Sequence, residues 1–169
     1  MSFALFALMQ PVVLAYGLVG GVFLAFSDFI MRSLSRTKGA CGAETMQTIN
    51  REVVRWGVMT LFLGLVPASL TIIVYAVTTF DGTGSKIIVL SGLIYLLGCF
   101  GVTVMFNVPM NTALGRIEPE TSAAIEYWTG TYLPRWTFWN TVRTCACILS
   151  AALLMFGMLE VLWSQTPVS

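Results

Sequence analysis

The chain has 169 residues, of which 57% are hydrophobic and only 10% are charged, and its mean hydropathy is +0.83. A water-soluble domain of this length carries far more charge on its surface, so the composition indicates a protein of the lipid bilayer. The net charge of +1 offers no basic face, and we expect no nucleic-acid partner. The sequence contains no His, which removes the commonest metal ligand, general base and axial haem ligand.

Four apolar runs are each long enough to cross a bilayer as a helix. With their flanks they predict membrane helices over residues 5–31, 43–80, 87–108 and 138–163. Apolar character without a two-residue alternation favours helices over a β-barrel. The expected fold class is therefore all-α, an integral membrane antiparallel four-helix bundle, with residues 1–169 as a single domain.

Three local patterns refine these helices. The first apolar run is too long for a signal peptide and has no Lys or Arg before Arg32. Prolines interrupt the segment 109–139, where we expect a short helix over 121–132 with Thr121 as its cap. Gly17 and Gly21 are four residues apart and predict a close contact between the first helix and a neighbour.

The positive charges predict how the bundle is oriented. Five Lys or Arg residues follow the first helix, one follows the second, three surround the third connection, and the two ends have none. Cytoplasmic loops are enriched in Lys and Arg. We therefore expect the first and third connections inside the cell and both termini outside.

Polar side chains from all four helices fall at one level, near the predicted inner ends. They are Asp28 on the first helix, Asn50, Glu52 and Arg55 on the second, Asn107 and Asn111 on the third, and Asn140 and Arg143 on the fourth. Charged groups within a bilayer are costly and are usually paired or functional. We expect Asp28 to form an ion pair with Arg143 or Arg55.

This polar ring has two interpretations. It is either a structural clasp that ties the helices together near the interface, or a ligand pocket that opens inward. In the pocket, Arg143 and Asn140, three residues apart, share a helix face and both donate to one ligand oxygen.

Aromatic residues precede that pair at helical spacing. Steps of 4, 4 and 3 residues separate Trp128, Tyr132, Trp136 and Trp139, which share one face if Pro134 only kinks the segment. They form either an aromatic belt at the membrane interface or a lid over a flat aromatic ligand. The four cysteines show no metal-binding spacing and are expected to be structural thiols.

Four segments carry a resemblance to a known family over nearly the whole chain. They are FSDFIM at 26–31, MQTIN at 46–50, FNVPMN at 106–111 and WTFWNTVRT at 136–144. These resemble the successive signatures of the anthrone-oxygenase-like family, small four-helix membrane proteins that are mostly bacterial and of unknown function. The resemblance implies a bacterial inner-membrane location. Fungal members use molecular oxygen to convert an anthrone to an anthraquinone, with no established cofactor.

The residues to which the resemblance assigns a functional role are Asp28, Asn107, Asn111, Trp136, Asn140 and Arg143. One position departs from the family pattern, because many relatives have His where this chain has Thr141. With no His there, we expect Asp28 to act as the base that forms a carbon-acid anion. Arg143 and Asn140 then hold the anion's oxygen.

Two functions from different classes follow. The first is a cofactor-light, oxygen-dependent oxygenase or oxidase, or a binding protein, for a flat lipophilic aromatic or quinone-like molecule. Its catalytic residues are Asp28, Asn140 and Arg143, and its ligand-binding residues are Asn107, Asn111, Trp128, Tyr132, Trp136 and Trp139. No haem or metal ligand set is evident, and the cofactor stays unassigned. The second is a non-catalytic accessory subunit that contacts lipids and the other subunits of a larger membrane complex.

Overall fold

A computed structural model describes residues 3–55 and 57–164, which form helices and turns and contain no strand. The elements, in chain order, are α1 (Phe3–Ala25), η1 (Phe26–Ile30), α2 (Met31–Ser35), α3 (Cys41–Glu52), α4 (Val58–Thr79), α5 (Thr83–Ile94), η2 (Tyr95–Gly101), η3 (Thr103–Asn107), α6 (Val108–Gly115), α7 (Ser122–Tyr127), η4 (Trp128–Tyr132) and α8 (Leu133–Ser164). The four η elements are π-helical turns that run without interruption into their neighbouring α-helices.

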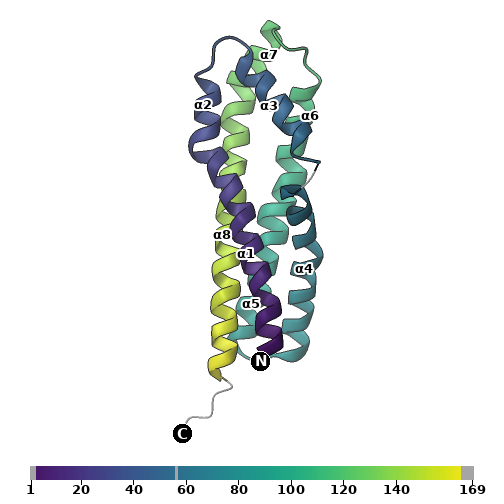
Figure 1. Cartoon of the computed structure of the whole chain (residues 1–169), viewed down its shortest axis with the longest axis vertical. Helices are drawn as coiled ribbons and strands as arrows, with labels where there is room; N and C mark the ends of the chain where they lie inside the picture. Colours follow the sequence, from purple (N-terminus) through teal and green to yellow (C-terminus); the bar gives the residue numbers. More distant parts are fainter. Residues whose placement is uncertain (1–2, 56, 165–169) are drawn as a thin grey trace.

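The helices form an elongated antiparallel bundle (Figure 1). α1 begins and α8 ends at the same end of the bundle, where α4 turns into α5. The α2–α3 turn and the α6–α7 connection lie at the opposite end, which we call the α3 end. Four stretches are long and apolar enough to cross a membrane, at Met9–Ser35, Val58–Thr79, Thr83–Gly115 and Ser122–Ser164. The predicted all-α membrane bundle is confirmed.

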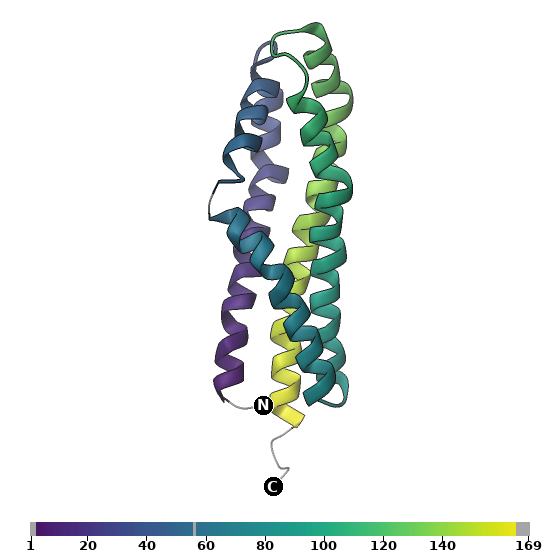
Figure 2. The ribbon, with the colours of Figure 1, turned by 90° about the vertical axis from the view of Figure 1, so that its right-hand side faces the viewer.

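The second predicted helix, over 43–80, is divided into two. α3 ends at Glu52 and α4 begins at Val58, and Figure 2 shows the two as separate helices. Gly57 has φ of 55°, a left-handed conformation that side chains disfavour and that cannot continue an α-helix. The prediction of one continuous helix is therefore wrong at this glycine.

The third and fourth predicted helices are longer than expected. Helical structure continues over Thr83–Gly115 and Ser122–Ser164, through Pro109 and Pro134. A π-helical turn comes just before each of these prolines, which have no N–H group to donate within the helix. Thr121 is the cap predicted for the short helix over 121–132, because its Oγ1 accepts a hydrogen bond from the Ala124 nitrogen at 3.2 Å. That helix does not end at Tyr132 but continues into α8.

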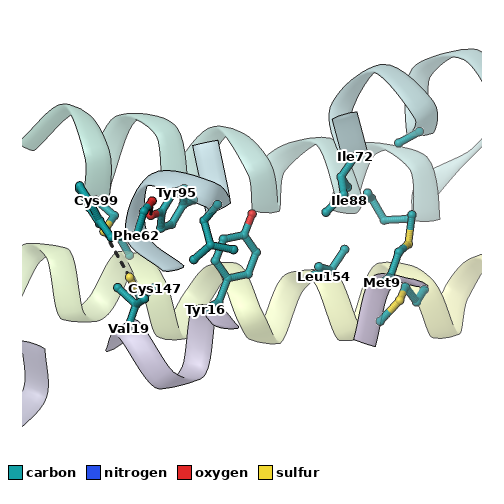
Figure 3. Packing of buried hydrophobic residues seen from close by; sticks show 14 of the residues in the cluster. Met9, Tyr16, Val19, Phe62, Ile72, Ile88, Tyr95, Cys99, Cys147 and Leu154 are labelled. Atoms are coloured by element: carbon teal, nitrogen blue, oxygen red, sulfur yellow. Dashed lines mark hydrogen bonds between the residues drawn. The ribbon is translucent and has the colours of Figure 1, made fainter. Parts of the chain in front are cut away.

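Small residues bring α5 and α8 together. A Cβ atom on Gly84 would lie 2.9 Å from the Val161 nitrogen, and one on Gly157 would lie 3.0 Å from the Ile88 nitrogen. On α1 the close contact is made by Gly20. The predicted contact at Gly17 and Gly21 is wrong, because both face outward and a Cβ atom on either would meet nothing within 4 Å. The larger apolar core of the bundle contains Tyr16, Phe62, Tyr95, Cys99 and Leu154, among others (Figure 3).

Candidate functional site

A cavity of about 140 Å³ lies in the half of the bundle nearer the α3 end. Its aromatic lining comes from Phe23, Phe26, Phe62 and Trp136, and its polar lining from Asn50, Thr103, Asn111 and Arg143. Aliphatic side chains complete the wall, including Val54 and Val108. These two valines are 58% and 47% exposed, so they form the rim through which the cavity opens.

Arg143 is the charged group of this cavity and is only 5% exposed. Its Nη2 donates to Asn140 Oδ1 at 2.6 Å and its Nη1 donates to Thr103 Oγ1 at 3.2 Å. The guanidinium carbon lies 4.2 Å from the centre of the Phe23 ring and 5.3 Å from that of Trp136. Neither of the ion pairs formed within residues 3–55 and 57–164 involves Arg143. Its Nε has no hydrogen-bond partner among the described residues.

Asn140 positions Arg143 instead of facing the ligand space. Its Nδ2 donates to the Phe23 carbonyl oxygen at 2.6 Å and to Ser27 Oγ at 2.7 Å. Both amide hydrogens are therefore used on α1 and η1, and Asn140 Oδ1 is turned toward the guanidinium. The expectation that Asn140 and Arg143 both donate to one ligand oxygen is wrong, because Asn140 accepts from Arg143 in this arrangement.

The predicted ion pair of Asp28 with Arg143 or Arg55 is also wrong. Asp28 Oδ1 lies 3.1 Å from Nη2 of Arg32, one helical turn later, and both side chains are mostly exposed. Arg55 pairs with Glu52 at 3.2 Å. Neighbours three and four residues apart on a helix meet without crossing the bundle, so these local pairs form in place of the predicted long-range one.

Asp28 lies on an open groove and does not line the cavity. The groove lies between α2 and α8 and is lined by Ser27, Asp28 and Thr141, with others. Thr141 Oγ1 donates to Ser27 Oγ at 2.9 Å, and Asn140 also donates to that hydroxyl. Thr141 therefore faces the groove, while its neighbour Asn140 reaches Arg143 at the cavity.

The aromatic residues divide into a buried stack and a separate pair. Trp128, Tyr132 and Trp136 are at most 4% exposed and stack in succession, with ring centres 5.4 and 5.9 Å apart. Trp139 leaves this series and stacks on Phe106 at 3.7 Å. The stack faces the interior and not lipid, which contradicts a belt at these three positions, and Trp136 is the member that lines the cavity.

Asn111 ties the stack to the cavity wall. Its Oδ1 accepts from Tyr132 Oη at 2.7 Å and from Trp136 Nε1 at 2.8 Å. Asn50 Nδ2 also donates to Tyr132 Oη, at 3.3 Å. Asn107 is fully buried beside Trp136, and its Oδ1 has no partner within the part of the chain that the structure describes.

Thr103 and Phe23 belong to the site although the polar pattern did not single them out. Thr103 precedes Asn107 by four residues and Asn111 by eight, and this helical spacing was the available signal. Phe23 has no comparable signal, because its role depends on how α1 is rotated against α8. The structure thus gathers Asn50, Thr103, Asn107, Asn111, Trp136, Asn140 and Arg143, and leaves out Asp28 and Trp139.

No curated protein and no solved structure is significantly similar to the chain. A family model described as anthrone oxygenase matches residues 51–153, which include α4 to α6 and most of α8 with Arg143. The chain therefore belongs to the anthrone oxygenase family.

Proposed function

We propose that the cavity binds a flat, lipophilic aromatic or quinone-like molecule and holds an anionic oxygen of that molecule on Arg143. The unpartnered Nε of a buried arginine carries this proposal. A buried cation without an anion is costly, and a ligand oxygen on the free N–H offsets that cost. Among the polar groups of the described lining, Asn111 Oδ1 already accepts from Tyr132 and Trp136, and Thr103 Oγ1 already accepts from Arg143 Nη1.

The shape and lining support an aromatic ligand. A cavity of about 140 Å³ is close to the volume that accepts one benzene ring. Phe23, Phe62 and Trp136 supply ring faces and edges for a flat molecule. A ligand of several fused rings extends past Val54 and Val108 toward the surrounding lipid.

The chemistry proposed for the cavity is oxidation of a carbon acid such as an anthrone. Arg143 favours the ionised form of the bound ligand by attracting the enolate oxygen. The enolate carbon then adds molecular oxygen, and the resulting hydroperoxide loses water to leave a carbonyl group. One CH₂ group and one O₂ give one C=O group and one H₂O. Because Asp28 is not part of the described lining, the proposed reaction relies on the acidity of the ligand and on water for the proton transfer.

Ligand binding and oxygen uptake by the purified full chain in detergent test the proposal. Anthrone, anthraquinone and a one-ring enolisable ketone form the panel, with tryptophan fluorescence and an oxygen electrode as readouts. We expect Arg143→Lys to weaken binding of anthrone at least about tenfold, since Lys keeps the charge but loses the planar donor group. Arg32→Lys, at an exposed pair outside the cavity, should bind as the parent does.

Failure of the parent to bind any member of this panel contradicts the proposal. Stable co-purification with another membrane protein in the same preparation then favours the accessory-subunit alternative. Equal binding by the parent and by folded Arg143→Lys assigns the ligand to another surface.

A further inference from the structure

Two cysteines that are 48 residues apart in the chain meet inside the bundle. Cys147 Sγ lies 3.3 Å from Cys99 Sγ, and both side chains are fully buried. Figure 3 shows the two sulfur atoms facing each other, Cys99 from η2 and Cys147 from α8. A disulfide bond is about 2.05 Å long, so small side-chain rotations separate this contact from a bond.

The helices around the two thiols approach each other closely. A Cβ atom on Gly98 would lie 2.9 Å from the Ala146 Cβ, so the backbones of η2 and α8 approach closely next to the cysteines. On the other side, a Cβ atom on Gly20 of α1 would lie 3.0 Å from the Cys147 Cβ. The Cα atoms of a disulfide usually lie about 4.4–6.8 Å apart, and close backbone approach of this kind is compatible with such a bond.

The thiol pair lies directly beside the proposed ligand cavity. Cys99 is one turn before Thr103, whose Oγ1 donates to the Cys99 carbonyl oxygen at 2.8 Å, and Cys147 is one turn after Arg143. Phe62 lines the cavity and belongs to the same buried cluster as Cys99 and Cys147 (Figure 3). The cavity therefore brings a small uncharged oxidant within about one helical turn of the two sulfurs.

We propose that Cys99 and Cys147 form a reversible dithiol–disulfide pair that a peroxide oxidises. One sulfur attacks the O–O bond, forming an S–O bond and releasing the far oxygen, which takes the first thiol proton. The second sulfur displaces the remaining hydroxyl group, which leaves as water with the second thiol proton, and the S–S bond forms. With hydrogen peroxide, the two thiols lose two electrons in total and the peroxide becomes two molecules of water. The proposed disulfide does not depend on the proposed ligand, because neither cysteine lines the cavity.

The experiment uses the purified full chain in detergent, with Cys41→Ser and Cys145→Ser removing the two exposed cysteines. The folded protein is treated with hydrogen peroxide, quenched with catalase, then unfolded and alkylated. We expect Cys99 and Cys147 to lose alkylation together, with a mass lower by two hydrogens, and dithiothreitol to restore both. Cyanogen bromide cleavage at methionine should give fragments 60–105 and 111–155 that stay joined until they are reduced.

Cys99→Ala in the same background is the matched control. It keeps Cys147 in place, and it should give no joined fragments at any peroxide dose. The proposal is overturned if Cys99 and Cys147 both remain alkylatable at doses that oxidise Cys145 of the parent. It is equally overturned if the two sulfurs are oxidised separately to sulfinic acids without a joined fragment. Circular dichroism before and after treatment establishes that both results come from folded protein.

Discussion

Arg143 Nη2 donates to Asn140 Oδ1 at 2.6 Å, so the principal partner of a buried cation is a neutral amide one turn earlier on the same helix. Asn140 is itself fixed by donating to the Phe23 carbonyl oxygen and to Ser27 Oγ. This arrangement orients the guanidinium without neutralising it. The positive charge is therefore retained for whatever occupies the cavity.

Asn140→Asp should convert this arrangement into an internal ion pair. The carboxylate has the shape of the amide and carries the counter-charge that the parent lacks, so an anionic ligand no longer gains from Arg143. It also loses the donor to the Phe23 carbonyl oxygen, so the side chain is expected to turn toward Ser27 Oγ and Arg143. We expect affinity for an anthrone-type anion to fall at least about tenfold, or about 1.4 kcal/mol, in a fluorescence titration. Asp28→Asn is the control, because Asp28 faces the groove and its pair with Arg32 is exposed. A larger loss in Asp28→Asn than in Asn140→Asp would restore Asp28 as the functional acid or base.

Asn111→Leu should destabilise the protein more than Asn107→Leu. Replacing Asn111 removes the acceptor of two buried donors, Tyr132 Oη and Trp136 Nε1, and each unsatisfied donor costs about 1–3 kcal/mol. Asn107 contributes one long hydrogen bond of 3.4 Å and has an unpartnered oxygen among the described contacts, so its loss should cost less than about 1 kcal/mol. The free energy of unfolding, from denaturant titration in detergent, measures both. Equal losses of unfolding free energy in Asn111→Leu and Asn107→Leu would show that the hydrogen bonds to Asn111 are weak.

Gly84→Ala should lower stability through the contact of α5 with α8. The new methyl group would lie 2.9 Å from the Val161 nitrogen and 3.1 Å from the Gly157 oxygen, and these backbone atoms cannot move aside cheaply. Overpacking of this kind costs about 1–3 kcal/mol. Gly64→Ala is the matched change on α4, where nothing lies within 4 Å, and it should be neutral or stabilising by up to about 1 kcal/mol. Thermal unfolding of the two variants compares them; no loss in Gly84→Ala would mean that the helices separate easily.

The orientation in the membrane is predicted by the charge distribution. Asp81 lies in the short turn between α4 and α5, and Cys41 begins α3 at the opposite end of the bundle, so the two label opposite sides. In spheroplasts, a membrane-impermeant maleimide should label Asp81→Cys from outside and leave Cys41 unlabelled until the membrane is permeabilised. The label count is read by mass spectrometry in a background without Cys145. Labelling of Cys41 alone in intact spheroplasts would reverse the predicted topology.

Depth along the helices was enough to predict most of the candidate site. Antiparallel helices of similar length bring residues near their ends to one level, and this placed Asn107, Asn111, Asn140 and Arg143 together. Rotation about the helix axis is not given by depth. The rotation of each helix about its own axis turns Asp28 toward the groove and Arg32. The same rotation brings Cys99 to Cys147, a contact that the sequence did not predict.

The π-helical turns are the main reason why side-chain directions departed from the expected α-helical pattern. η4 lies within the aromatic series, and beyond it Trp136 continues the stack while Trp139 turns away to Phe106. Gly57 had a similar effect on the predicted second helix, because its positive φ interrupts the helix where the apolar pattern of the sequence is continuous. These backbone features arise from tertiary packing and carry little signal in hydropathy.

The wide turn η3 gives the third membrane segment one place where it tolerates a change in length. A π-helical turn holds about one residue more than an α-helical turn, so deleting one residue between 103 and 107 would return η3 to α-helix and leave the helix beyond it in nearly the same orientation. A deletion within the regular α-helix on either side would instead rotate everything beyond it by about 100°. Single-residue deletions among functional variants should therefore be concentrated at 103–107, whereas substitutions should be tolerated at exposed positions such as Val104 and Met105.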